Sequence, residues 1–164
     1  MILPRQFLGE IIRPVLSALA VAEPRLHSTA AEQLLLGTAL KESGLEDLRQ
    51  KGRGPALSMF QVEPATFYWL WRDVVLARYP RVGLALGRFL FNGFSPIEQL
   101  AGNQHFACGI ARIRYWVVTE PLPAAGDVAG MARYWGAHYQ TDSVPAQMRE
   151  WVRLYETFCE ECFQ

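Results

Sequence analysis

Cysteine, net charge and long apolar runs are all scarce in this chain, and each scarcity argues against a class of protein. The 164 residues include three cysteines, and so small and odd a number argues against a disulfide framework. The 16 basic residues balance the 16 acidic ones, so composition gives no electrostatic reason to expect nucleic-acid binding. No apolar stretch reaches the length that a membrane span needs.

The N-terminal region resembles an export signal only superficially. Its apolar run from Val15 to Ala22 is interrupted on its approach by Glu10, Arg13 and Pro14, and a secretory signal lacks such breaks. We expect the segment from Pro4 to Ala22 to form a buried amphipathic helix that kinks or starts near Pro14. The protein would then stay in the cytoplasm where it is made, or leave by another route.

The cysteines form one short motif, Cys159-x-x-Cys162, with Cys108 far away in the sequence. No second pair of cysteines or histidines supplies the remaining ligands of a metal site. We therefore expect two small core residues at the end of a terminal helix, and we predict neither a metal nor another cofactor.

The rest of the pattern is mostly helical, and the length suits one domain that spans residues 1–164. Helix starts are signalled by capping boxes at Thr29–Glu32 and Ser95–Glu98, by Pro64 and by Asp127. The predicted helices cover 30–43 (ended by Gly44), 64–79, 82–91, 96–118 with a break near Asn103, one after Asp127, and 144–163. The expected fold is mainly α, or α+β, with at most a small hairpin within 45–58.

Glu42 is the leading candidate for chemistry. On its helix Leu35, Leu36, Ala39 and Leu40 define the buried arc, and Glu42 lies at the edge of that arc. Apolar neighbours and the negative end of the helix dipole both favour the protonated carboxyl, as a general acid working near neutral pH requires.

A second motif begins twelve residues after Glu42, Gly54-Pro-Ala-Leu-Ser-Met-Phe-Gln-Val-Glu-Pro-Ala-Thr66. With Glu42-Ser43-Gly44 it resembles the "E-S … G-A-x-G-L-M-Q-x-x-P-x-T" pattern of soluble lytic transglycosylases in the lysozyme-like superfamily. The stretch Ala132 to Thr141 is similar to a segment of small proteins of this type in tailed bacteriophages. Together the motifs touch most of the chain, from about Leu34 to Tyr155.

The resemblance implies a lysozyme-like fold and a sugar-binding cleft. Glu42 corresponds to the single acid/base carboxylate, and Ser43 belongs to the same motif. Gln61, with the backbone near Ser58 and Met59, would bind and orient the sugar. A further residue, Tyr134, matches the tyrosine whose hydroxyl approaches the catalytic glutamate.

Several positions leave alternatives open. Glu63 is a second carboxylate that would assist Glu42 or hold Gln61, although a capping role at the start of the helix opened by Pro64 is favoured. Ser58 stands where the family usually has glycine, so a positive φ there would be strained. Trp135 stands where the family has asparagine. We interpret Arg112 and Arg114 as a solvated helix face and His138 as a surface or packing residue, and core packing is favoured for Trp69, Trp71 and Trp116.

The predicted function is cleavage of the β-1,4 bond between N-acetylmuramic acid and N-acetylglucosamine with formation of 1,6-anhydro ends. A phage-encoded, virion-associated enzyme would act on the periplasmic cell wall, with glycan strands and other virion proteins as partners. One alternative is a lysozyme-type hydrolase, for which Glu46 and Asp47 offer nearby carboxylates. The other is an inactive lysozyme fold that serves as a virion structural or binding protein.

Overall fold

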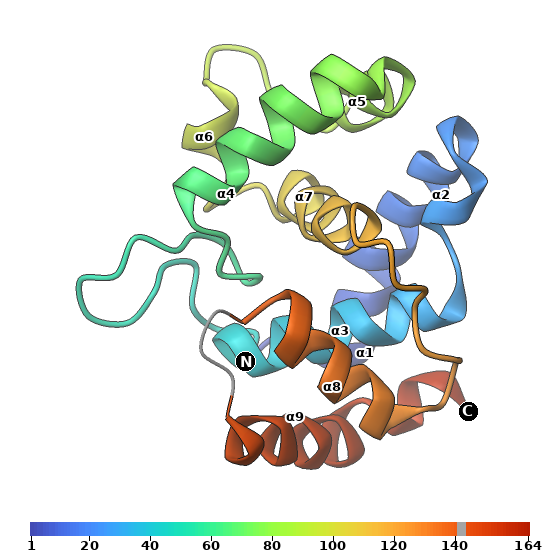
Figure 1. The fold of residues 1–164 in the computed structure, drawn as a ribbon. Coiled ribbons are helices and arrows are strands. Elements are labelled where there is room, and N and C mark those ends of the chain that lie inside the picture. The colour runs from blue at the N-terminus through green and yellow to red at the C-terminus, as the bar shows by residue number, and fades with distance from the viewer. Residues whose placement is uncertain (141–143) are drawn as a thin grey trace.

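A computed structural model describes residues 1–140 and 144–164, and helices dominate it (Figure 1). The prediction of a mainly α protein is therefore confirmed, and no strand occurs among the described residues. The only β pairing there consists of two isolated bridges, Arg49 with Leu57 and Leu57 with Val62. The helical segments are α1 (Pro4–Phe7), η1 (Leu8–Ile12), α2 (Arg13–Ala22), η2 (Pro24–Leu26), α3 (Thr29–Ser43), α4 (Pro64–Tyr68), η3 (Trp69–Leu76), α5 (Pro80–Gly87), α6 (Pro96–Gln99), α7 (Gln104–Trp116), α8 (Val128–His138), α9 (Pro145–Phe158) and η4 (Glu160–Phe163).

The N-terminal helix runs without interruption through α1, η1 and α2, and η1 is a wider π-helical turn directly before Pro14. Proline has no N–H to donate to the carbonyl four residues earlier, which here belongs to Glu10. The Glu10 carbonyl bonds instead to Nε2 of His105 on α7, at 2.9 Å. The helix therefore does not start near Pro14 but contains a π-helical turn just before it, and the carbonyl that Pro14 leaves free links two helices.

Helix α3 is the central helix, and Figure 1 shows it between α7 on one side and the pair α8 and α9 on the other. It begins one residue earlier than predicted, because the hydroxyl of Ser28, rather than that of Thr29, accepts a hydrogen bond from the N–H of Ala31. The carboxylate of Glu32 instead receives bonds from Arg13 and His27. Gly44 ends the helix with φ of 63°, as the sequence predicts.

The close approach of α9 to α3 depends on Gly37. A Cβ atom on Gly37 would lie 2.2 Å from the ring of Trp151, which is fully buried. Trp151 in turn stacks on Tyr155, with ring centroids 5.4 Å apart. The glycine is therefore what lets a large aromatic side chain of α9 lie directly against the central helix.

The segment from α4 to α7 follows the predicted pattern with differences in its first two helices. The predicted helix 64–79 is π-helical over Trp69–Leu76, and α5 begins at Pro80, two residues before the predicted start. Helix α5 ends at Gly87 instead of Phe91, because the amide of Gln99 holds the chain beyond it by bonding to both backbone groups of Phe91 and to the carbonyl of Phe94. The capping box of Ser95 and Glu98 forms. The break near Asn103 is also present, with Asn103 capping α7.

The C-terminal region ends in a short 3-10 turn after α9, so the last predicted helix is interrupted at Cys159. Cys159 is buried, Cys162 is half-buried, and burial raises the pKa of the Cys159 thiol to about 12. Within residues 1–140 and 144–164 no group of histidine, cysteine and acidic side chains is placed to hold a metal ion. None of the described helices is both long and apolar enough to cross a bilayer.

Candidate active site

Glu42 lies in the last turn of α3 and is half-buried. The indole N–H of Trp135, on α8, donates a hydrogen bond of 2.8 Å to its Oε1 atom. Trp135 itself is completely buried. Because an indole can only donate, this contact fixes Oε1 as an acceptor and leaves Oε2 as the oxygen that carries the proton when Glu42 is protonated.

The environment of Glu42 shifts its ionisation in the direction that an acid catalyst needs. Burial raises the pKa of this carboxyl above its ordinary value, and the Trp135 hydrogen bond and the charges of Lys41 and Arg114 offset the shift only in part. Loss of hydration destabilises the charged form, whereas a donor and nearby cations stabilise it. The raised pKa therefore means that desolvation exceeds the three stabilising contacts together.

Two cations border the carboxyl from different elements. Lys41 lies over the ring of Trp135, with Nζ 5.6 Å from the centroid, and forms an ion pair of 3.0 Å with Glu150 on α9. Arg114, on α7, lies over the ring of Tyr139 at 3.9 Å and donates to the Tyr139 carbonyl. The ammonium group of Lys41 is therefore held by Glu150 and the ring of Trp135. The guanidinium group of Arg114 is held by the ring and the carbonyl of Tyr139.

The loop between α3 and α4 forms the opposite wall. Backbone bonds of 2.9 and 2.8 Å join Leu57 and Val62 around a tight turn. Within this turn Ser58 has φ of 70° and Gln61 has φ of 47°, which is the left-handed region that a residue with a Cβ rarely adopts. The positive φ anticipated for Ser58 is present, and Gln61 shares it.

Glu42 and Gln61 line the same pocket, of about 380 Å³. The pocket lies at the junction of α3 with its following loop, and its remaining lining is strongly polar: Lys41, Ser43, Gly44, Glu46, Asp47, Gln50 and Lys51. The backbone N–H of Gln61 and one N–H of its side-chain amide bond to the Ser58 carbonyl. The side-chain oxygen of Gln61 accepts no hydrogen bond from the described residues, so it is available to a ligand.

Three other predicted binding residues are engaged inside the protein. The hydroxyl of Ser43 donates to the Ala39 carbonyl at 2.9 Å. The Ser58 hydroxyl accepts from the N–H of Phe60, and Ser58 is fully buried. Met59 is buried and its N–H donates to Gln104. Their side chains shape the turn and the helix end.

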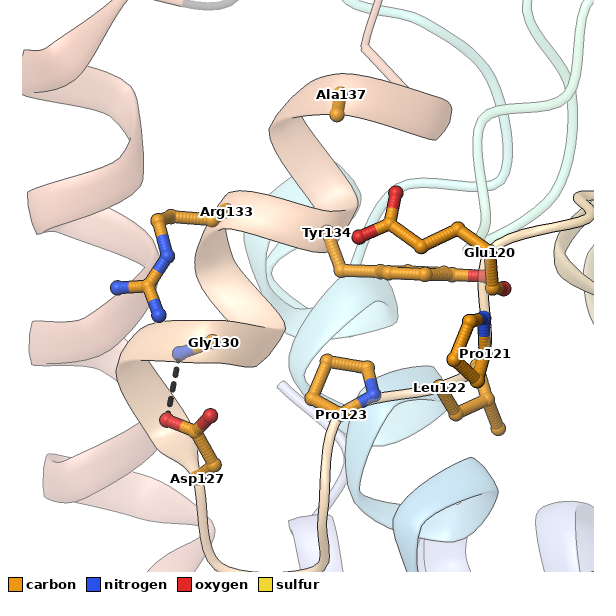
Figure 2. A pocket seen from close by; sticks show the side chains of 9 residues that line it. All are labelled: Glu120, Pro121, Leu122, Pro123, Asp127, Gly130, Arg133, Tyr134 and Ala137. Carbon is orange, nitrogen blue, oxygen red and sulfur yellow. Dashed lines mark hydrogen bonds between the residues drawn. The ribbon is translucent and has the colours of Figure 1, made fainter.

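Tyr134 does not line the Glu42 pocket. The motif implies a tyrosine hydroxyl close to the catalytic glutamate, but the hydroxyl of Tyr134 bonds to another residue. Its hydroxyl donates to the carbonyl of Glu120 at 2.9 Å, and its ring lines a separate pocket of about 470 Å³ between α8 and the linker before it (Figure 2). The physical reason is helical geometry, since neighbouring residues point about 100° apart. On α8 it is Trp135 that faces Glu42.

The charge of Glu42 affects the pKa values of two buried tyrosines, Tyr115 and Tyr139. Burial is the main cause that raises the pKa of each, and the Glu42 charge contributes in both cases. Tyr139 donates from its hydroxyl to the Phe60 carbonyl at 2.7 Å, so it ties α8 to the tight turn of the loop. Tyr115 bonds to Thr38 on α3.

Glu63 is exposed at the N-cap position of α4, but its side chain makes no capping bond. Gln61 is held by the Ser58 carbonyl, and Glu63 is absent from the lining of the Glu42 pocket. Glu63 therefore occupies the predicted capping position at the start of α4, but without a side-chain hydrogen bond to the helix. A role for Glu63 in assisting Glu42 remains a prediction.

The interpretation of Arg112 and Arg114 as a solvated face is wrong. Arg112 is 3% exposed and donates to the carbonyls of Leu26 and Arg25, and burial lowers its pKa to about 10. Arg114 is half-buried beside the site. His138 behaves as predicted, since it is half-buried and bonds to Glu120. Trp69, expected in the core, is 44% exposed.

Comparisons of this chain with protein-family models, with curated proteins and with solved structures gave no match. The family resemblance therefore depends on the motifs at Glu42, Gly54–Thr66 and Ala132–Thr141 alone. Thr141 lies outside the described residues.

Proposed function

We propose that the protein is a lytic transglycosylase of the lysozyme-like type that cleaves the glycan strands of peptidoglycan. The observation that carries the proposal is a half-buried carboxyl of raised pKa, held by Trp135 and open to a polar pocket shared with Gln61. A raised pKa lets a carboxyl keep its proton to higher pH, as a general acid requires.

In this mechanism Oε2 of Glu42 gives its proton to the glycosidic oxygen as the bond from that oxygen to C1 of the muramic acid breaks. The resulting carboxylate then accepts the proton of the muramoyl C6 hydroxyl as that oxygen bonds to C1. Glu42 is regenerated, no water is consumed and a 1,6-anhydro ring closes. The attack is intramolecular, so it avoids most of the entropic cost of bringing two reactants together.

The three groups around Glu42 serve both halves of this cycle. Trp135 keeps Oε1 as the acceptor, so the proton stays on the oxygen left for the substrate. Lys41 and Arg114 stabilise the carboxylate that forms after the first proton transfer. Gln61 offers its amide oxygen to a sugar hydroxyl or acetamido N–H across the pocket.

The test is digestion of purified peptidoglycan by wild type, by Glu42→Gln and by Glu156→Gln, with mass spectrometry of the released fragments. Glu156 is an exposed carboxylate on α9 and controls for the amide substitution. We expect anhydromuropeptides from wild type and from Glu156→Gln, and at least a thousandfold less from Glu42→Gln. A folded wild-type protein that binds peptidoglycan and releases nothing would leave only the structural or binding alternative.

A hydrolase of the same general type is the second candidate, because two further carboxylates, Glu46 and Asp47, line the Glu42 pocket. One of them would activate a water molecule. Asp47 forms an ion pair of 3.1 Å with Lys51, and Glu46 forms one of 2.8 Å with the N-terminal amine. Products heavier by one water than the anhydro forms, lost in Asp47→Asn or Glu46→Gln, would favour hydrolysis.

The place of action follows from the proposed substrate. Peptidoglycan is anionic and the chain has no net charge, so the overall charge of the protein gives no attraction to the wall. We propose that it is carried to the periplasmic wall as part of a phage virion. The host cytoplasm, where such a protein is made, is the other expected location.

A further inference from the structure

Exposed hydrophobic side chains are concentrated in one part of the molecule. Residues 64–94 are about a fifth of the chain, yet they hold half of the large hydrophobic side chains exposed in the described residues. These are Tyr68, Trp69, Leu76, Tyr79, Leu84, Phe91 and Phe94. Single exposed hydrophobic residues are ordinary, but such a concentration marks an interaction surface.

The same segment is strongly basic. It contains four arginines, Arg72, Arg78, Arg81 and Arg88, against one acidic residue, Asp73. Because the whole chain is neutral, the remainder carries the compensating negative charge. The backbone N–H of Arg88 bonds to the Leu86 carbonyl, but the side chains of Arg81 and Arg88 form no ion pair or hydrogen bond within the part of the chain that the structure describes. Positive charge is therefore in excess within residues 64–94, where the unpaired side chains of Arg81 and Arg88 belong to the same segment as the exposed hydrophobic side chains.

Helix α5 brings the two kinds of side chain together. Leu84, at its centre, is 74% exposed, and Arg81 and Arg88 stand three residues before it and four after it, on the same helix face. An apolar groove of about 690 Å³ lies on one side of Leu84, lined also by Trp71, Leu76, Pro80, Gly83, Gly87 and Arg88.

The other side of Leu84 extends onto α2. A smaller pocket there, of about 170 Å³, is lined by Leu84, by both arginines and by Val21, which is 80% exposed. Helix α5 packs against α2, and Figure 1 shows α5 and the end of α2 at the same end of the molecule. We call the set Val21, Leu76, Arg81, Leu84 and Arg88 the α5 surface.

We propose that the α5 surface binds the face of an anionic lipid bilayer. Leu84 and Val21 project from the surface, so they can enter the boundary between headgroups and acyl chains, where an apolar face supported by cations binds. The guanidinium groups would meet lipid phosphates, while their aliphatic stems stay on the apolar groove. Exposed Trp69, Tyr68 and Tyr79 on the adjoining helices belong to the residue types that favour this interface.

The inference is independent of the proposed catalysis, since none of these residues lines the Glu42 pocket. It also requires no membrane span. The end of the molecule that carries α5 would contact the bilayer surface. The zero net charge of the protein would not oppose this contact, because electrostatic attraction depends on the charges within about a Debye length of the surface.

The test uses the full chain and sedimentation with vesicles of phosphatidylcholine alone or mixed with phosphatidylglycerol, at low and high salt. We expect binding to the mixed vesicles only, and weaker binding at high salt. Arg81→Gln with Arg88→Gln should weaken it about fivefold for each charge removed, and Leu84→Glu at least tenfold. Leu48→Glu changes another exposed leucine, in the loop after α3, and should bind as wild type does.

Three results would overturn the proposal. One is the absence of binding to the mixed vesicles at low salt by a folded wild-type protein. Another is binding that Leu84→Glu and the double arginine variant leave unchanged. The third is a wild-type dimer that Leu84→Glu converts to a monomer, since the surface would then be an interface between two copies of the chain.

Discussion

The hydrogen bond from Trp135 to Glu42 is the contact that distinguishes this glutamate from an ordinary one in a last helical turn. Trp135→Phe removes the donor and keeps an aromatic ring. Because that donor lowers the pKa of Glu42, we expect the pKa to rise further. The decline of any wall-cleaving activity on the alkaline side, where the general acid loses its proton, should then move to higher pH. Carbon NMR of the Glu42 carboxyl checks the ionisation directly.

The control for this prediction is Trp116→Phe, a half-buried tryptophan on α7 that packs on Tyr79. Trp135→Phe also leaves space in the core, at a cost of about 1–3 kcal/mol in stability. A purely structural role for Trp135 would lower stability and leave the Glu42 titration unmoved, and that outcome would contradict a positioning role.

The raised pKa of Glu42 has a consequence for stability. A carboxyl whose pKa is higher in the folded state binds a proton on folding, so its contribution is complete below the ordinary value of 4.5 and is lost as pH rises through the folded-state pKa. Glu42→Gln carries no such charge. We therefore expect Glu42→Gln to gain stability relative to wild type as pH rises through that window.

Urea unfolding at a series of pH values measures this difference, with Glu156→Gln as the matched substitution. Near the lower end of the window the two proteins should unfold at similar urea concentrations. A difference between Glu42→Gln and wild type that stays constant across the series would show that burial does not penalise the charged carboxyl. The prediction needs no substrate, so it holds whether or not the protein is an enzyme.

At the scale of elements, the packing of α9 on α3 depends on Gly37, which has no side chain. Gly37→Ala would place a Cβ against the buried ring of Trp151, and we expect a loss of about 1–3 kcal/mol from overpacking. Gly9→Ala is the matched control, since Gly9 lies in the first long helix with open space around it. It should add up to about 1 kcal/mol through helix propensity.

Thermal or urea unfolding of the two variants gives both values. Equal effects of the two substitutions would mean that α9 can shift away from α3 without cost. Tyr155, stacked on Trp151, makes that shift difficult, because the pair would have to move together.

The elements themselves were largely predictable, because their signals are local. Pro64, Ser95 with Glu98, and Asp127 each act within one helical turn, and each begins a helix in the structure. The errors arose where a distant group competes with a local one. Gln99 ends α5 early from outside that helix, and Glu32 bonds to Arg13 and His27 instead of capping α3.

The candidate site was predictable only in part for the same reason. Glu42 and Gln61 could be found from motifs, since each belongs to a short recognisable pattern. Trp135 and Arg112 could not, because their partners lie 93 and 86 residues away in the sequence. Tyr134 was favoured over Trp135 by the motif, and only the rotation of α8 decides which of them faces α3.

At the scale of the whole molecule, a net charge of zero hides an arrangement of charge. Residues 64–94 carry an excess of arginine, and the lining of the Glu42 pocket contains three acidic residues beside two lysines. Composition reports only the sum, so it gave no electrostatic reason to expect nucleic-acid binding. The distribution, which depends on the fold, instead supports one end of the molecule as the part that meets an anionic surface.

Because Trp135 bonds to Glu42, the fluorescence of Trp135 can report the ionisation of Glu42. Indole fluorescence responds to a charge on a hydrogen-bonded neighbour, and Trp135 is otherwise shielded from solvent. Of the five tryptophans, it is the one whose N–H bonds to this carboxyl. The difference in fluorescence emission between wild type and Trp135→Phe would therefore measure the ionisation of Glu42 without an added label. The measurement can be repeated as sugar fragments are added.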